Sequence, residues 1–396
     1  MKKNYMKRNG HKGLEAYSQF FDKEVAKKNF IAPLIGKDAN SIIQLKEVTN
    51  KEKCNKAIFN LRGYLHGNEG ALHIDDFESG EGRLHFVSDC VAFKDIFYVL
   101  RAADKDLFGE YSMHELRKEA KYSLVDWYTD CLSAMFFLHV SGYTAFSIEN
   151  YAPNENADKT FDNILYYYSS HQPTRPTDKR IIRANGKATD EELDENDIFS
   201  LELLDKAILR AKRETPRMRP VCVDGENFYV LYLHPIQLDQ LRANTEKEQW
   251  REITKALHYK KSETNSPLLN GAVGIYNGVI LHETERVTPG VQYNEVNEGE
   301  GHKYSRDKCV PNVRRAVLLG ARSVIMAIKK DRGARYKFAE KRFSYSNELG
   351  VIFTTTIGMK KTRFNIWSPT RQLSSSLFCD VAQQDFGVIV LPTYAA

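Results

Sequence analysis

Three histidines and one aspartate are the residues whose types and spacing come closest to a site of chemistry. His66, His73 and His85 lie near one another in the chain, and Asp75 shares a strand face with His73, since alternate residues of a strand point the same way. An imidazole beside a carboxylate can hold a divalent metal, as in a metal-dependent hydrolase. The surrounding segment is polar and broken by glycines, so it offers no rigid support. We therefore assign no metal, catalytic or cofactor-binding residue, and keep the hydrolase as a distant alternative.

Two further histidines follow expected strands, where α/β enzymes often place active groups. His234 ends the apolar run Phe228–Leu233 and precedes Pro235, without an acid or nucleophile beside it, which favours a helix-entry residue. His282 and Glu283 could form an acid/base pair, but a structural or interface hydrogen bond is the favoured interpretation. The sequence also lacks a Walker phosphate loop, a G-x-S-x-G elbow, a G-x-G-x-x-G loop and an H-E-x-x-H motif. We expect no enzymatic activity and no cofactor.

Composition limits the classes of protein that remain. The 396 residues, of which 42% are hydrophobic, predict two or three domains or one body with long excursions. The net charge of +5 includes no concentrated basic block, which argues against a dedicated nucleic-acid binder. The six cysteines form no C-x-x-C pair and are expected to be reduced thiols in a cytoplasm. The basic N-terminus has no apolar h-region, and no apolar run approaches the ~18 residues of a membrane span.

The elements that would position any site begin with one long helix, expected over residues 112–140. Apolar residues recur there every three or four positions, which indicates a helix of roughly 43 Å at 1.5 Å per residue. Residues 14–30 also have helical spacing, and the rest of 1–50 is expected to be an extended arm. Residues 55–100 predict a two-stranded excursion whose apolar faces are too thin for it to be stable alone.

The remaining elements are expected in this chain order: a polar surface excursion over 149–198 whose acidic run 190–197 is a solvated face, a helix over 200–214, a strand at 228–233, a helix at 236–243, a helix carrying Trp250, a strand at 279–281, a helix from Asn312 through Ile328, a strand pair over 348–364 with a turn near Gly358, and a strand at 386–391. The body is therefore α+β. Its arm, hairpin and long helix each need a neighbouring surface, which favours a subunit that interlocks with copies of itself.

Several segments together resemble the major capsid proteins of the N4-like podoviruses. The most specific is Asn270–Glu283, NGAVGIYNGVILHE, where that family has Thr-Gly-Ala-Leu-Gly-Met-Tyr-Asn-Gly-Val. The segment Leu65–Leu72, LHGNEGAL, is similar to the family's Gly-Asn-Glu-x-Ala-Leu. Further matching segments are the helix from 116–120 to 126–127, residues 229–235 with 241–242 and Trp250, and residues 315–321 and 386–390.

The resemblance implies the HK97-like capsid fold, in which an N-terminal arm, an E-loop hairpin, a peripheral domain with a spine helix and an axial domain follow in order. The implied ranges are 1–50 for the arm, 51–105 for the E-loop, 106–199 and 341–372 for the peripheral domain, and 200–340 and 373–396 for the axial domain. No lysine, asparagine and glutamate match the positions with which some relatives of this fold crosslink their subunits.

The function implied by the resemblance is that of a major capsid protein of a tailed double-stranded DNA bacteriophage. Copies would form hexamers and pentamers of an icosahedral shell, assembled in the host bacterial cytoplasm and carried in the virion. The implied partners are a portal protein, a separate scaffolding protein, optional decoration proteins and packaged DNA contacted without sequence specificity, with no membrane. A gene-transfer agent capsid and an encapsulin-type nanocompartment are the structural alternatives.

Overall fold

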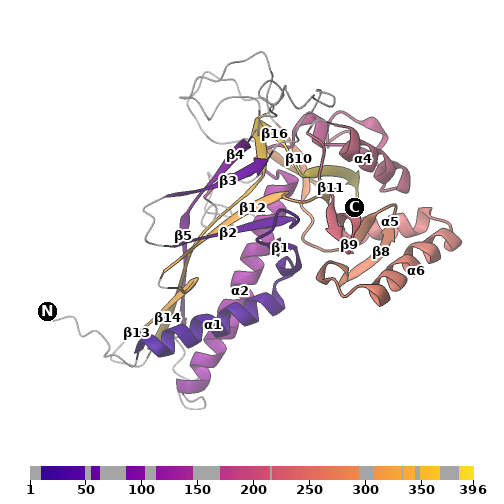
Figure 1. Cartoon of the computed structure of the whole chain (residues 1–396). Coiled ribbons are helices and arrows are strands. Elements are labelled where there is room, and N and C mark those ends of the chain that lie inside the picture. Colours follow the sequence, from indigo (N-terminus) through magenta and orange to yellow (C-terminus); the bar gives the residue numbers. More distant parts are fainter. Residues whose placement is uncertain are drawn as a thin grey trace, which may run out of the picture.

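The structure is a computed structural model that describes residues 10–49, 55–62, 86–102, 113–145, 170–214, 216–293, 307–331, 333–343, 348–365 and 383–396. It confirms the α+β class, with one six-stranded and one seven-stranded sheet. Figure 1 shows the six-stranded sheet beside two long helices, and the seven-stranded sheet with three further helices next to them.

The six-stranded sheet is built around one long strand, β14 (Glu348–Lys361). Its order is β1-β2-β12-β14-β13, and β5 pairs with β14 as well. The other members are β1 (Ile35–Gly36), β2 (Ile43–Thr49), β5 (Lys94–Ala102), β12 (Val324–Lys330) and β13 (Tyr336–Phe343). All partners of β14 are antiparallel to it, whereas β2 runs parallel to β12. Residues 35–49 therefore differ from the expected extended arm, because β2 lies within the sheet.

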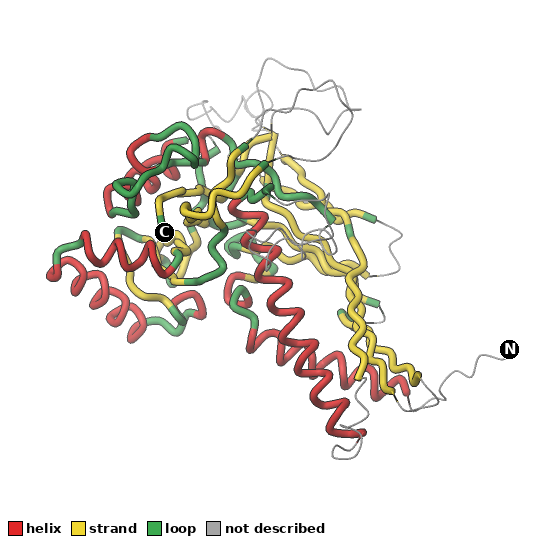
Figure 2. Tube along the Cα trace, turned by 180° about the vertical axis from the view of Figure 1, so that it is seen from behind, coloured by secondary structure: helices red, strands yellow, loops and turns green. Residues whose placement is uncertain are grey.

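Two helices cover one face of this sheet, as the view from behind also shows (Figure 2). Helix α2 (Met113–Ser141) confirms the expected spine, and α1 (Gly10–Lys28) confirms the helical spacing of residues 14–30. Helix α1 contacts the sheet through Phe21, which is 1% exposed. The Phe21 ring centroid lies 4.8 Å from that of Tyr336 and 4.9 Å from that of Phe353. This aromatic cluster is the core that joins helix α1 to the sheet.

A two-stranded hairpin lies on the other face of the sheet. Strands β3 (Lys56–Arg62) and β4 (Phe86–Ala92) pair antiparallel, as expected for the first part of the excursion over 55–100. The second expected strand does not continue to residue 100 within the hairpin, because the chain from Lys94 onward forms β5 of the six-stranded sheet. Ala57, Phe59 and Val91 are buried against Ile325 and Ala327 of β12. The hairpin is therefore stabilised by apolar packing on the sheet, since a two-stranded hairpin alone would be only marginally stable.

Gly358 has a different role from the expected turn. Strand β14 runs through it without interruption and pairs Gly358 with Ala327 of β12. A Cβ atom placed on Gly358 would lie 2.1 Å from the carbonyl oxygen of Ala92, at the base of the hairpin. The expected strand pair with a turn is wrong, because this glycine permits close approach of two backbones rather than a reversal of the chain.

The seven-stranded sheet has the order β10-β11-β7-β9-β8, and β17 and β6 pair with β11 and β7. Its strands are β6 (Val221–Val223), β7 (Glu226–Leu233), β8 (Ala272–Tyr276), β9 (Val279–Glu283), β10 (Pro289–Gln292), β11 (Lys308–Leu319) and β17 (Val388–Tyr394). Its helices are α4 (Leu201–Arg213), α5 (Pro235–Asn244) and α6 (Lys247–Glu263). These helices confirm the three expected between residues 200 and 263, and β7, β9 and β17 confirm the expected buried strands.

The loop between β8 and β9 explains the most specific sequence motif. Asn277 and Gly278 have φ angles of 44° and 75°, so both central residues of this two-residue hairpin loop adopt positive φ. That geometry is typical of a type I′ turn and favours an Asn-Gly pair. The motif is thus a folding signal of the sheet.

The helix expected from Asn312 through Ile328 is wrong. The segment forms β11 and β12, which lie in different sheets. Ala316–Leu319 and Val324–Ile328 are buried on both faces, and such continuous apolar runs fit a buried strand as well as a helix. Gly320 lies between them, where a Cβ atom would be 2.4 Å from the carbonyl oxygen of Arg219.

Candidate assembly interface

The candidate metal ligands His66, His73, Asp75 and His85 lie outside the described residues. Within the residues that are described, no group of three or more His, Cys, Asp or Glu side chains could hold a metal ion. The same part of the chain contains no helix long and apolar enough to cross a membrane.

His234 is the helix-entry residue that the sequence predicts. Its Nδ1 accepts a hydrogen bond of 3.4 Å from the backbone N–H of Ile236, while Gln237 Oε1 accepts one of 3.0 Å from the His234 N–H. These reciprocal bonds cap α5. Burial, with a contribution from Arg314, lowers the pKa of His234 to about 4. The ring is neutral at pH 7 and acts as a hydrogen-bond acceptor.

His282 likewise has a structural role. Its Nε2 donates to the carbonyl oxygen of Leu268 at 2.9 Å, and its ring centroid lies 5.2 Å from that of Tyr232. Burial lowers its pKa to about 4. The structural hydrogen bond favoured for this residue is confirmed, and Glu283 is exposed beside it.

A buried ion pair joins the spine helix to the seven-stranded sheet. Arg315 Nη2 lies 2.6 Å from Asp190 Oδ2, and both side chains are 0% exposed. Arg315 Nη1 donates to the Ser141 carbonyl oxygen, at the end of α2, at 3.2 Å. Arg183 Nε donates to Asp190 Oδ1 at 2.6 Å, and the Val291 N–H donates to Oδ2 at 3.0 Å. Burial alone would raise the pKa of Asp190, but the two guanidinium groups and the Val291 N–H outweigh it and lower this pKa.

This pair corrects the interpretation of the acidic run 190–197 as a solvated face. Glu191, Glu192 and Glu195 are exposed as expected, but Asp190 and Asp197 are buried. Asp197 accepts a 2.6 Å hydrogen bond from Asn185 Nδ2 and a 2.9 Å bond from the Asp194 N–H. The two buried aspartates are satisfied by partners, as buried charges must be, and fix this connecting segment to the domain.

A second buried cluster lies where β14 leaves the six-stranded sheet. Lys361 Nζ lies 2.7 Å from Asp385 Oδ2, with both side chains 1% exposed, and Arg363 Nε donates to Oδ1 at 2.8 Å. Arg180 Nε donates to the Asp385 carbonyl oxygen at 3.1 Å. Burial lowers the pKa of Lys361 to about 8, against the opposing effect of Asp385. This cluster ties together β15 (Arg363–Asn365), β16 (Gln383–Asp385) and the 3-10 turn η4 (Asp178–Arg180).

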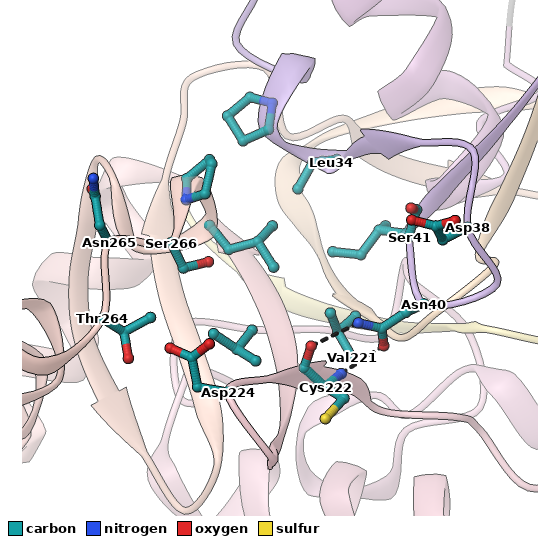
Figure 3. A pocket seen from close by; sticks show the side chains of 15 residues that line it. Leu34, Asp38, Asn40, Ser41, Val221, Cys222, Asp224, Thr264, Asn265 and Ser266 are labelled. Atoms are coloured by element: carbon teal, nitrogen blue, oxygen red, sulfur yellow. Dashed lines mark hydrogen bonds between the residues drawn. The ribbon is translucent and has the colours of Figure 1, made fainter.

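The N-terminal segment meets the seven-stranded sheet at a cavity of about 410 Å³ (Figure 3). Asn40 points from the loop before β2 toward strand β6. Its Nδ2 donates to the Cys222 carbonyl oxygen at 2.6 Å, and its Oδ1 accepts from the Cys222 N–H at 2.7 Å. The side-chain amide thus pairs with the outer edge of β6 much as a neighbouring strand would.

An Asn40→Ala substitution is expected to lower the free energy of unfolding by about 1–2 kcal/mol, because two hydrogen bonds to the backbone are lost. Urea unfolding followed by fluorescence measures this change. Asn265→Ala is the matched control, since Asn265 lines the same cavity and no hydrogen bond of its side chain is found among the described residues. Equal stability of the two variants would show that the Asn40 contact contributes nothing.

Among the described residues, the hairpin covers only part of the outer face of the six-stranded sheet. The hairpin β3–β4 lies over β2 and β12, but further along the sheet Phe97 is 65% exposed and Val99 is 49% exposed. These two residues of β5 pair across the ladder with Thr354 and Ile352 of β14, which are half-buried. An exposed aromatic and aliphatic surface on a sheet is typical of an interaction site.

The comparisons with known proteins identify the family. A family described as "Phage capsid protein" matches residues 9–396. This chain belongs to the phage capsid protein family. A search of curated proteins found no match.

Solved capsid structures share the fold of this capsid protein. The capsid of Ralstonia phage GP4 superposes with a TM-score of 0.71 at 23% identity, over 93% of this chain and 92% of that one. The capsid of cyanophage Pam1 gives 0.56 at 18% identity, over 92% of each chain. The head of Helicobacter pylori bacteriophage KHP40 gives 0.56 at 15% identity, over 93% and 91%. The expected HK97-like capsid fold is thereby confirmed.

The chain is therefore a phage capsid protein, and the family points to a structural role. A capsid is a shell built of protein subunits, so the candidate site is the surface by which copies of this chain would meet. Sequence reasoning located the hairpin and the spine helix that frame this surface. It did not single out Phe97 and Val99, although their alternation with buried Ile96 and half-buried Tyr98 marks one exposed apolar face.

Proposed function

We propose that copies of this capsid protein assemble through the outer face of the six-stranded sheet into hexamers and pentamers of an icosahedral shell. The observation that carries the proposal is the exposure of the apolar side chains of Phe97 and Val99 on that face. The other side of the same strand is packed, since Ile96 is buried and the Tyr98 ring centroid lies 4.5 Å from that of Trp127. Strand β5 is therefore well packed on its inner side, and the exposure of Phe97 and Val99 is not a result of loose packing of the strand.

The hairpin supports the same proposal. Ile58 of β3 is 56% exposed on the side opposite to the buried Ala57 and Phe59. Ile58 on the hairpin and the exposed side chains of β5 are therefore on the same side of the six-stranded sheet. A second copy could contact both apolar surfaces from that side. Each contact is small, but a shell repeats it many times, so weak contacts become strong collectively.

We propose domain names from the two sheets and the helices that pack on them. The six-stranded sheet with α1 and α2 would be the peripheral domain, and the seven-stranded sheet with α4–α6 the axial domain. The hairpin β3–β4 would be the base of the E-loop. Because β12 and β13 belong to the six-stranded sheet, we place the return to the peripheral domain near Gly320, ahead of residue 341, and assign β2 to that domain.

Within the family, we propose that this protein belongs to the N4-like podovirus group, on the strength of the Asn270–Glu283 motif. Its further partners would be a portal protein, a separate scaffolding protein, decoration proteins and packaged double-stranded DNA contacted without sequence specificity. Assembly would take place in the host bacterial cytoplasm. The modest net charge of +5 is compatible with a wall facing DNA without tight binding.

A Phe97→Lys substitution tests the proposed contact surface. Burying a phenylalanine contributes about 1.5–3 kcal/mol, which is about tenfold or more in the equilibrium constant of one contact. A lysine there would also have to be desolvated. We expect the variant to remain folded by circular dichroism but to form few or no rings or shells by negative-stain electron microscopy.

Phe97→Leu is the matched control, because it keeps an apolar side chain at the same position. It is expected to assemble as the wild type does. If Phe97→Lys assembles at the wild-type concentration and yield, the outer face of β5 is not a subunit contact and the proposed surface is wrong.

A further inference from the structure

The base of the β3–β4 hairpin is held to the body of the protein by a small set of polar contacts. Lys46 Nζ donates to the Ile58 carbonyl oxygen at 2.9 Å, and Arg322 Nη1 to that of Asn60 at 3.4 Å. On the other strand, Asp89 Oδ1 lies 2.5 Å from Lys360 Nζ. Lysine and arginine keep their charge at every acidic pH, so the contacts made by Lys46 and Arg322 persist as the pH falls.

One contact in this set depends on an imidazole. The backbone N–H of Ala92, at the end of β4, donates to Nε2 of His171 at 2.8 Å. A backbone N–H can only donate, so Nε2 must carry its lone pair and no proton. Ala92 is also the residue whose carbonyl oxygen lies against Gly358. His171 therefore contacts the hairpin where it comes closest to the sheet.

The groups around His171 make a second positive charge unfavourable. Lys56 of β3 and Lys360 of β14 act on it electrostatically, and His139 of α2, which is 1% exposed, interacts with it as well. The carboxylate of Asp89 on the hairpin is already bound to Lys360. Burial, followed by the two lysines, lowers the pKa of His171 to about 4. The ring is thus a neutral acceptor at pH 7.

We propose that His171 is an acid-sensitive latch for the base of the β3–β4 hairpin. A proton taken from solvent onto Nε2 removes the acceptor of the Ala92 N–H, which then turns to water. It also places a cation among Lys56, Lys360 and His139. The hairpin base separates from residues 170–171, while the two sheets and the spine helix persist.

The direction of the pH effect follows from linkage. In the released state His171 is solvated and has its ordinary pKa of 6.5, whereas in the latched state the pKa is about 4. The proton therefore binds preferentially to the released state. The latch is at full strength above pH 6.5 and weakens as the pH falls, by up to about tenfold per pH unit, until about pH 4.

The consequence for assembly rests on the proposed function. If the hairpin contacts an adjacent subunit, the latch sets how readily it can be repositioned during shell formation. Release of the hairpin base itself requires no second copy, so it can be measured on the full chain whether or not the protein assembles.

The test is hydrogen–deuterium exchange of the peptide that contains Ala92, read by mass spectrometry from pH 7.5 to pH 4 and corrected for the intrinsic rate at each pH. In the wild type, protection is expected to fall by more than tenfold between pH 6.5 and pH 4.5, while a peptide from the buried part of α2 stays protected. His171→Gln places an amide oxygen near Nε2 and does not titrate, so its protection should stay flat over the same range.

His258→Gln is the matched control, since His258 is exposed on α6, and it should respond as the wild type does. Two results would overturn the proposal. One is wild-type protection of Ala92 that does not change down to pH 4.5. The other is an equal loss in His171→Gln, which would assign the response to a group other than His171. Because the wild type is measured by itself, the proposal can be rejected even where the variant fails to fold.

Discussion

The Asp190→Asn protein is expected to unfold with about 3–5 kcal/mol less free energy than the wild type, because it leaves the Arg315 guanidinium buried without its counter-charge. Both side chains of this pair are 0% exposed, and Asp190 also accepts from Arg183 and Val291. Breaking the pair would loosen the connecting segment, the end of α2 and β11 together. Urea unfolding, followed by circular dichroism, measures the change.

Glu191→Gln is the control, since Glu191 is the exposed neighbour in the same acidic run, and it should change stability by less than about 0.5 kcal/mol. The double variant Asp190→Asn with Arg315→Met should recover part of the loss, because no uncompensated charge at position 315 remains buried. Wild-type stability in Asp190→Asn would show that the pair does not hold this junction together.

Replacement of Phe21 by alanine is the second large effect, with an expected loss of about 3–5 kcal/mol. Phe21 is 1% exposed and lies among rings from α2, β13 and β14. Its removal would leave a cavity where α1 meets the sheet. The thermal midpoint and the urea midpoint should both fall, and proteolysis should cut within α1 first.

Phe20→Ala is the matched control, because Phe20 is only half-buried and contacts the ring of Tyr122, with centroids 5.8 Å apart. Its loss should be clearly smaller. If the two variants are equally stable, Phe21 does not anchor α1 to the sheet. Residues 10–28 would then behave as part of the N-terminal arm expected over residues 1–50.

The long helix was predictable because it combines length with sustained periodicity. The expectation over 112–140 and the observed Met113–Ser141 differ by one residue at each end. The transition from β7 to α5 was also predictable. Within a helix, proline is tolerated only in the first turn, so Pro235 marks the start of α5, and His234 before it can cap the helix. In both cases local chemistry and tertiary structure agree.

The errors arise where tertiary context decides. Residues 312–328 carry small and β-branched residues at helical spacing, but they pair across two different sheets, which no local pattern reveals. Gly358 was interpreted as a turn because a glycine's role depends on the backbone that approaches it. The extended arm was wrong for residues 43–49, because their strand partner, β12, lies far away in the sequence.

The buried ion pair was missed for a similar reason. Asp190 stands in an acidic run with exposed members, and its partner is 125 residues further along. One indication was available: Arg315 directly precedes the apolar run Ala316–Leu319, and an arginine beside a buried run needs a partner. That observation predicts a carboxylate but does not identify which one.

Electron microscopy of the purified full chain tests the central claim most directly. Negative-stain images, with size-exclusion chromatography alongside, should show shells, or rings of five and six copies, and image averages should place the face that carries Phe97 at a contact between neighbouring copies. A protein that stays monomeric at high concentration, even with the scaffolding protein of its phage supplied, would contradict self-assembly of this chain into a shell.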